Sequence, residues 1–125
     1  FNMRLDSIID ENLTIHINRG DQLELTLIDN ENPFIAGDKF KFSIMKANDS
    51  TTVLLQKEYI VENNTNSFDI VVSSEEMRLG DPIKTGTKTY WYEIEHNGIY
   101  TVIGYDQQGP KQLIMYPEAA SKEDN

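Results

Sequence analysis

The residues of this 125-residue chain that could do chemistry are few and scattered. There is no cysteine, and the only two histidines are His16 and His96. A metal site needs several converging ligands, and a nucleophilic triad needs three groups held together. No nucleophile elbow, His-Glu-x-x-His pair or phosphate-binding glycine loop occurs. We therefore predict no catalytic residue, no cofactor and no metal ligand, and we expect both histidines to be solvated.

Three short patterns deserve a test against simpler explanations. Arg19-Gly20-Asp21 spells an adhesion tripeptide, but a Gly-Asp turn between two strands explains it. Asp29-Asn30-Glu31-Asn32 offers oxygen ligands to calcium without the spacing of a calcium loop. Glu93 and Glu95 share one strand face and could perform acid–base chemistry, although such pairs are usually solvated. We interpret all three patterns as turns and polar surface.

The aromatic segment Thr89–Glu95 gives a stronger signal. Its alternation puts Tyr90, Tyr92 and Ile94 on the core face and Trp91 on the other face. The segments 99–103 and 113–116 are apolar on both faces, so neighbouring strands would leave an apolar outer patch. Because Trp and Tyr are enriched at interface hot spots, the candidate protein-contact residues are Trp91, Tyr100 and Tyr116. Alternatively, the N-terminal segment or a loop of the same chain covers Trp91.

The charge balance limits the possible partners. The chain has 21 acidic and 11 basic residues, a net charge of −10, and its lysines and arginines are scattered along the sequence. Such a domain repels phosphate backbones and anionic lipids, so we expect neither nucleic acid nor membrane as a partner. The sequence has no apolar run of about 18 residues, and we expect no signal peptide.

Hydrophobic residues recur at every second position, which predicts strands that each have one buried and one wet face. The expected strands are 12–18, 22–27, 39–44, 53–61, 67–72, 90–95, 99–105 and 112–116. Asn97-Gly98 is typical of a tight hairpin, and 53–61 is apolar on both parities, which indicates a bulge or a change of sheet. Residues 74–80 read as one helical turn, and the crossing 80–87 suggests a Greek-key connection.

These elements predict an all-β fold, an antiparallel two-sheet β-sandwich of the immunoglobulin-like kind with one short helical turn near 74–80. Residues 3–118 form the single expected domain. We expect residues 1–2, which precede Met3, to be a cloning remnant, and residues 119–125 to be a flexible polar tail.

Three stretches carry a family resemblance: Ile15–Asp21, Gly37–Ile44, and Tyr90–Glu95 with Tyr100–Asp106 and Gly109–Lys111. With them the chain resembles a family of small immunoglobulin-like proteins encoded in tail and baseplate regions of phages and prophages of Gram-positive bacteria. It is also similar to the N-terminal domain of upper baseplate proteins. The resemblance implies a fold and a gene neighbourhood, and it implies no catalytic residues.

The function expected from these observations is a non-enzymatic virion structural or assembly protein, a component of a tail or baseplate. Its partners would be other virion or tail proteins, possibly a second copy of itself. Its location would be the bacterial cytoplasm during assembly and then the tail region of the virion. The alternative is an extracellular adhesion or glycan-binding module in which Trp91 lies beside Glu93 and Glu95.

Overall fold

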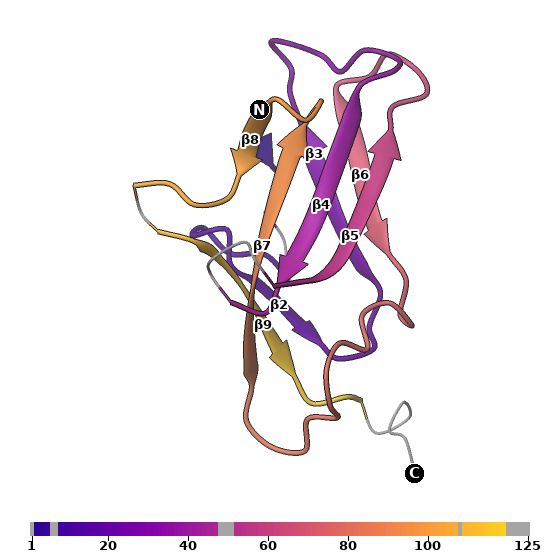
Figure 1. The fold of residues 1–125 in the computed structure, drawn as a ribbon. Helices are drawn as coiled ribbons and strands as arrows, with labels where there is room; N and C mark the ends of the chain where they lie inside the picture. Colours follow the sequence, from indigo (N-terminus) through magenta and orange to yellow (C-terminus); the bar gives the residue numbers. More distant parts are fainter. Residues whose placement is uncertain (1, 6–7, 48–51, 108, 120–125) are drawn as a thin grey trace.

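A computed structural model describes residues 2–5, 8–47, 52–107 and 109–119, which form a β-sandwich without helices (Figure 1). The nine strands, in chain order, are β1 (Asn2–Met3), β2 (Ile15–Asn18), β3 (Leu23–Ile28), β4 (Lys39–Met45), β5 (Val53–Ile60), β6 (Ser67–Val72), β7 (Lys88–His96), β8 (Tyr100–Ile103) and β9 (Lys111–Tyr116). All eight strands expected from the alternating pattern are confirmed, and β1 is an addition to them.

The strands form two sheets that pack face to face, as the fold prediction states. One sheet has the order β1-β3-β6, and the other has the order β2-β9-β7-β4-β5 with β8 beside β7. The chain changes sheet between β3 and β4, between β5 and β6, and again between β6 and β7, which is the expected Greek-key connectivity. One pair departs from the antiparallel expectation: β2 runs parallel to β9, with Ile15 opposite Leu113.

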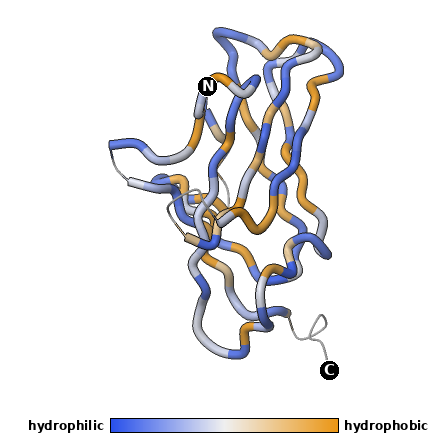
Figure 2. Tube along the Cα trace, viewed as in Figure 1, coloured by the Kyte–Doolittle hydropathy of each residue, from blue (hydrophilic) through white to orange (hydrophobic). Residues whose placement is uncertain are grey.

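The core lies between the sheets because each strand turns every second side chain inward. Along β7, Tyr90, Tyr92 and Ile94 are at most 3% exposed. Leu25 of β3 and Ile70 of β6 are equally buried on the facing sheet. Hydrophobic and hydrophilic residues alternate along the strands in Figure 2. Burial on this period drives the folding of the whole chain.

The bulge predicted in residues 53–61 lies at Leu54. Ile44 pairs with Leu55 and Met45 pairs with Val53, so Leu54 has no partner on β4. The strand does not change sheet; it stays paired with β4 along its length. The bulge leaves Leu54 40% exposed at the end of the sheet.

The open side of the sandwich is closed by side chains of β5. The Tyr59 hydroxyl donates to the Val71 carbonyl of β6 at 2.6 Å, and burial raises the pKa of Tyr59 to about 12, which keeps this donor protonated. Lys57 pairs with Glu76 at 2.8 Å across the same gap. The Tyr59 contact occupies a backbone carbonyl at the β6 edge that would otherwise be open to pairing with another strand.

The last strand of the six-stranded sheet is interrupted. β8 pairs with the end of β7 and β9 with its beginning, while residues 104–107 and 109–110 lie outside the sheet in a segment that we call the excursion (Figure 1). The excursion begins at Gly104, where a Cβ would lie only 2.8 Å from the Thr101 methyl group. It is closed by a bridge between Asp106 and Gly109. A glycine is therefore required where the chain turns away from β7.

Several local expectations need correction. Asn2, which the strand pattern did not include, pairs with Ile28 in β1. Residues 12–14, expected to open a strand, form a turn in which Leu13 has a φ of 62°. Residues 1 and 120–125 lie outside the described part of the chain. No helix in the described residues is long and apolar enough to cross a membrane.

The helical turn is present only as a hydrogen-bonded turn over residues 74–77. Ser73, not Ser74, caps it: its hydroxyl oxygen accepts from the Glu76 N–H at 3.2 Å, and the Glu76 carboxylate accepts from the Ser73 N–H at 3.2 Å. This reciprocal pair is a capping box. Within this turn, the Met77 side chain is completely buried in the core.

Arg19, at the end of β2, is the most extensively bonded buried charge in the described residues. Its guanidinium group donates to the carbonyls of Leu79 at 3.0 Å, Arg78 at 3.2 Å and Gly80 at 2.9 Å, and to the carboxylate of Glu118. The two charged side chains are 6% and 3% exposed. Arg19 thus joins β2, the loop after the 74–77 turn and the segment beyond β9.

We predict that Arg19→Met destabilises the fold by about 3–5 kcal/mol, because it leaves the Glu118 carboxylate buried without a counter-charge. Urea unfolding at neutral pH measures this free energy. Arg4→Met is the matched control, since Arg4 is exposed and, among the residues that the structure describes, its guanidinium group donates to the Thr26 hydroxyl alone, at 3.2 Å. A loss below about 1 kcal/mol for Arg19→Met, comparable with the control, would contradict the prediction.

Candidate interaction surface

Trp91 lies on the outer face of the six-stranded sheet, as predicted, but its own chain covers part of it. It pairs with Met45 on β4 and Gln112 on β9, and Met45 is only 4% exposed despite facing outward. Tyr105 and Pro110 of the excursion line the same small space of about 20 Å³. The indole Nε1 is buried and has no hydrogen-bond partner among the described residues. The structure thus favours the alternative in which a loop of this chain covers Trp91.

Tyr116 is held by a neighbour on β2. Its hydroxyl oxygen lies 3.0 Å from Nδ1 of His16, whose Nε2 lies 2.9 Å from the Asp10 carboxylate. The other Asp10 oxygen accepts from the N–H groups of Asn12 and Thr14, at 2.9 and 3.1 Å. Tyr116 is partly buried. It is the last side chain in the series Asp10, His16 and Tyr116, which orders the 10–14 turn.

Both histidines are engaged, so the expectation of solvated imidazoles is wrong. His16 bridges Asp10 and Tyr116. His96 stacks on Phe40, with ring centroids 4.9 Å apart and planes at 14°, and its Nε2 lies 3.4 Å from the Asp38 carboxylate. Each imidazole is less than half exposed and orders a strand end.

Tyr100 is the predicted contact residue that is freely presented. It is 65% exposed, and so are its neighbour Ile99 (74%) and Tyr105 of the excursion (73%). We call Ile99, Tyr100 and Tyr105 the β8 patch. Tyr100 pairs with His96, five residues along β7 from Trp91, which is about 17 Å in a strand. The structure therefore does not bring Trp91, Tyr100 and Tyr116 together as one cluster.

The carboxylate patterns have structural roles. Asp29 accepts from the N–H groups of Glu31 and Asn32, which lowers its pKa and shapes its own loop. No group of three or more His, Asp or Glu in the described ranges is arranged to hold a metal. Burial, and then the charge of Glu95, raises the pKa of Glu93, but the space beside Glu93 is too small for a substrate. The Arg19 guanidinium is buried, so it is not displayed as an adhesion tripeptide requires.

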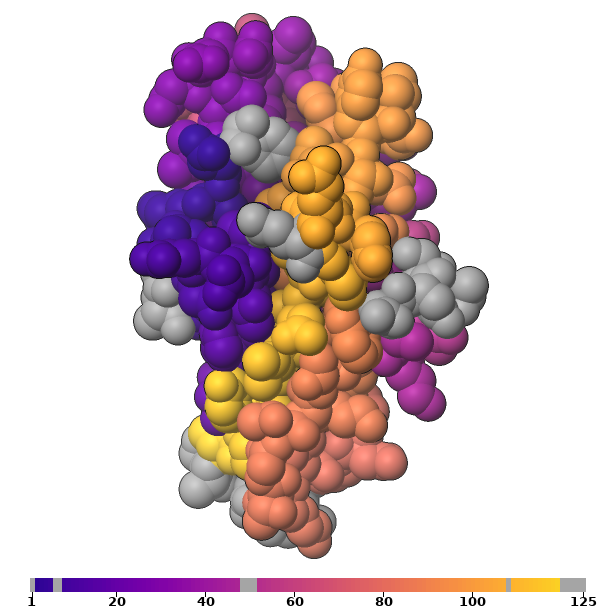
Figure 3. All heavy atoms as spheres, turned by 90° about the vertical axis from the view of Figure 1, so that its left-hand side faces the viewer, coloured from indigo at the N-terminus to yellow at the C-terminus, as the bar shows by residue number. Residues whose placement is uncertain are grey.

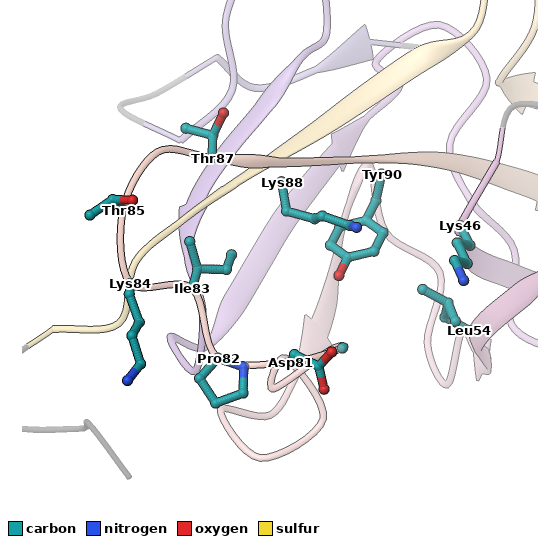
Figure 4. A pocket seen from close by; sticks show the side chains of 11 residues that line it. Lys46, Leu54, Asp81, Pro82, Ile83, Lys84, Thr85, Thr87, Lys88 and Tyr90 are labelled. Carbon is teal, nitrogen blue, oxygen red and sulfur yellow. The ribbon is translucent and has the colours of Figure 1, made fainter. Parts of the chain in front are cut away.

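A larger cavity of about 500 Å³ lies at the opposite end of the sheet from the β7–β8 hairpin, beside the 80–87 crossing (Figure 4). Lys46, Lys84 and Lys88 line it, together with Leu54 and the ring of Tyr90. The basic residues that look scattered in the sequence thus include three that meet in space. No short sequence motif predicts this cavity, because Lys46 lies about 40 residues before Lys84 and Lys88.

Comparison with known proteins adds no relative: the chain matches no protein-family model, no curated protein and no solved structure.

The Asp10–His16 contact predicts a pH dependence of stability. The hydrogen bond from His16, and then those from the Thr14 and Asn12 N–H groups, lower the pKa of Asp10 below its usual 3.8. A carboxylate with a lowered pKa stabilises the fold above its unfolded pKa, and this contribution is lost as the pH falls through the folded value. We expect Asp10→Asn to reduce the free energy of unfolding at about pH 6.

The difference between the wild type and Asp10→Asn should shrink below about pH 4. Urea unfolding across this pH range measures it, and Asp21→Asn provides a control for the loss of one carboxylate. An Asp10→Asn difference that stays constant down to about pH 2.5 would argue against the contact.

Proposed function

We propose that this protein is a non-catalytic structural or assembly component of a phage or phage-like tail, and that it acts through protein–protein contacts. The resemblance of Ile15–Asp21, Gly37–Ile44 and the β7–β9 region to baseplate-encoded immunoglobulin-like proteins supports the tail as the setting. The sandwich fold supports a rigid building unit. The protein would be assembled in the bacterial cytoplasm and then reside in the virion tail.

The β8 patch carries the proposal. Ile99, Tyr100 and Tyr105 are each at least 65% exposed, although large apolar side chains elsewhere on β7 and β9 are covered. Tyrosine gives a large contact area at low cost in side-chain entropy, and exposed large apolar side chains mark candidate partner sites. We propose that another virion protein covers this patch.

The charge of the domain supports a protein partner. With a net charge of −10, the surface opposes nonspecific association and phosphate binding, so contact is confined to surfaces that gain apolar burial or charge pairing. Neither nucleic acid nor membrane is part of the proposed function.

The glycan-binding alternative depends on Trp91 beside Glu93 and Glu95, and the geometry favours it less. A sugar platform needs an open aromatic face with polar groups at its rim. Here the excursion lies beside Trp91 and the indole Nε1 is buried. Direct binding to a glycan array distinguishes the two functions, since a structural subunit should bind none of the sugars.

We predict that Tyr100→Ser/Tyr105→Ser keeps the fold, with a change in unfolding free energy within about 1 kcal/mol, because both side chains are mostly exposed. We expect the variant to be lost from assembled particles. Mass spectrometry of purified particles, from cells in which the variant replaces the wild type, counts the incorporated copies.

Val71→Ser is the control for this experiment, since Val71 is an exposed apolar residue of the other sheet. We expect the control to enter particles normally. Undiminished incorporation of the double tyrosine variant would remove the β8 patch from the proposal, and absence of the wild type from particles would remove the tail function itself.

A further inference from the structure

The ion pairs of the lysines divide them into two groups. In the described residues, Lys39 and Lys41 pair with Glu58 at 3.6 and 3.9 Å, Lys57 pairs with Glu76 at 2.8 Å, and Lys111 pairs with Asp106 at 3.0 Å. Within those residues Lys46, Lys84 and Lys88 have no carboxylate partner within 4.0 Å, and these three line the 500 Å³ cavity. In a domain with ten more acids than bases, the lysines without such a partner have gathered at one place.

The walls of this lysine cavity define its preferred occupant. Leu54, Pro82, Ile83 and Tyr90 supply apolar surface, and Asp81 supplies the only carboxylate among the lining residues. The fixed charge around the cavity is therefore positive. An acidic group attached to an apolar side chain matches it better than a cation or a neutral polar molecule.

The opposite end of the sandwich carries the complementary chemistry. The loops 29–38 and 61–66 contain four acids, Asp29, Glu31, Asp38 and Glu62, and no lysine or arginine. Glu31 and Glu62 are exposed, and Ile35 between the acids is 61% exposed. We call these two loops the acidic tip. Figures 1 and 3 place the tip at one end of the molecule and the 80–87 crossing at the other.

We propose that the lysine cavity receives the acidic tip of a second copy of this chain, so that copies associate head to tail. Glu31 and Glu62 would pair with Lys84 and Lys88, and Ile35 would contact Leu54 and Ile83. Such a contact joins two different surfaces, so it generates a ring if its rotation closes and a filament if it does not. The inference concerns the chain itself and holds whether or not the assembly is a tail.

The net charge explains why this contact would be selective. Two copies that each carry −10 repel one another in most orientations. Stacking end to end places the lysines without carboxylate partners against two loops that contain acids and no lysine or arginine. Exposed lysine–carboxylate pairs contribute about 0.2–1 kcal/mol each, so we expect weak association that added salt suppresses.

The test uses two charge-reversed forms of the full chain. Lys84→Glu/Lys88→Glu destroys the cavity and keeps the tip, whereas Glu31→Lys/Glu62→Lys destroys the tip and keeps the cavity. Sedimentation velocity at low salt should show the wild type associating with rising concentration. Each variant alone should associate at least about tenfold more weakly than the wild type.

Mixing the two variants in equal amounts gives the decisive measurement. The intact tip of one variant then meets the intact cavity of the other, and the reversed cavity and reversed tip are also opposite in charge, so the mixture should recover the association that each variant alone has lost. Glu11→Lys/Glu24→Lys changes the net charge by the same amount as the tip variant, at exposed positions outside both ends, and it should associate at least as well as the wild type.

Three results would overturn the proposal. These are a wild type that stays monomeric at every concentration in low salt, a cavity variant that associates like the wild type, and a mixture that does not recover association. If the monomeric wild type instead shows NMR shifts at Lys84 and Lys88 on addition of inorganic phosphate, the cavity is a site for small anions and the head-to-tail contact is wrong.

Discussion

The end of the domain that carries the 80–87 crossing depends on the buried guanidinium group of Arg19. Arg19 and Glu118 are separated by 99 residues in sequence, and both lose their hydration on folding. That loss is tolerated only because three carbonyls and one carboxylate accept the guanidinium N–H groups. The same contacts fix the backbone at Gly80, where a Cβ would lie 2.7 Å from the Tyr90 hydroxyl. The position of the 80–87 crossing, and with it two of the three cavity lysines, follows from this interior charge.

The outer face of the six-stranded sheet is organised by a local break in its last strand. β8 and β9 lie along β7 as one interrupted strand, because the excursion between Ile103 and Lys111 stands opposite a single β7 residue, Glu93. By leaving the sheet, the chain covers the Trp91 indole and at the same time exposes Tyr105. The excursion thus leaves one aromatic residue, Trp91, covered and another, Tyr105, exposed. Trp91, whose residue type most suggests an interface hot spot, is therefore less accessible than Tyr105.

The alternating pattern predicted the fold because alternation can be recognised in a short stretch of sequence and it determines which side chains enter the two-layer core. Each strand with one apolar face must bury it, and two sheets are the simplest arrangement that does so. The pattern was wrong at Asn12–Thr14, where the Asp10 carboxylate holds the backbone N–H groups in a turn. It also could not reveal the parallel β2–β9 pair, the His16–Tyr116 contact or the Arg19–Glu118 pair. These join residues about 100 positions apart, and no short motif encodes such a distance.

Charged residues are distributed unequally between the two ends of the sandwich, so the two ends differ chemically. Lysines along the β4–β5 ladder and at Lys111 are neutralised within the domain, while those at the 80–87 end keep no carboxylate within reach among the described residues. The acids at the far end are likewise free of lysine and arginine in their own loops. The β8 patch begins at the β7–β8 hairpin, where His96 and Asn97 contact Asp38 of the acidic tip, so it lies at the tip end and away from the lysine cavity. The domain therefore presents a basic end and an acidic end, with exposed apolar side chains beside the acidic one. A second copy that docks on the acidic tip would lie next to the β8 patch, so the axial contact and the contact with a different partner would be made at the same end of the domain.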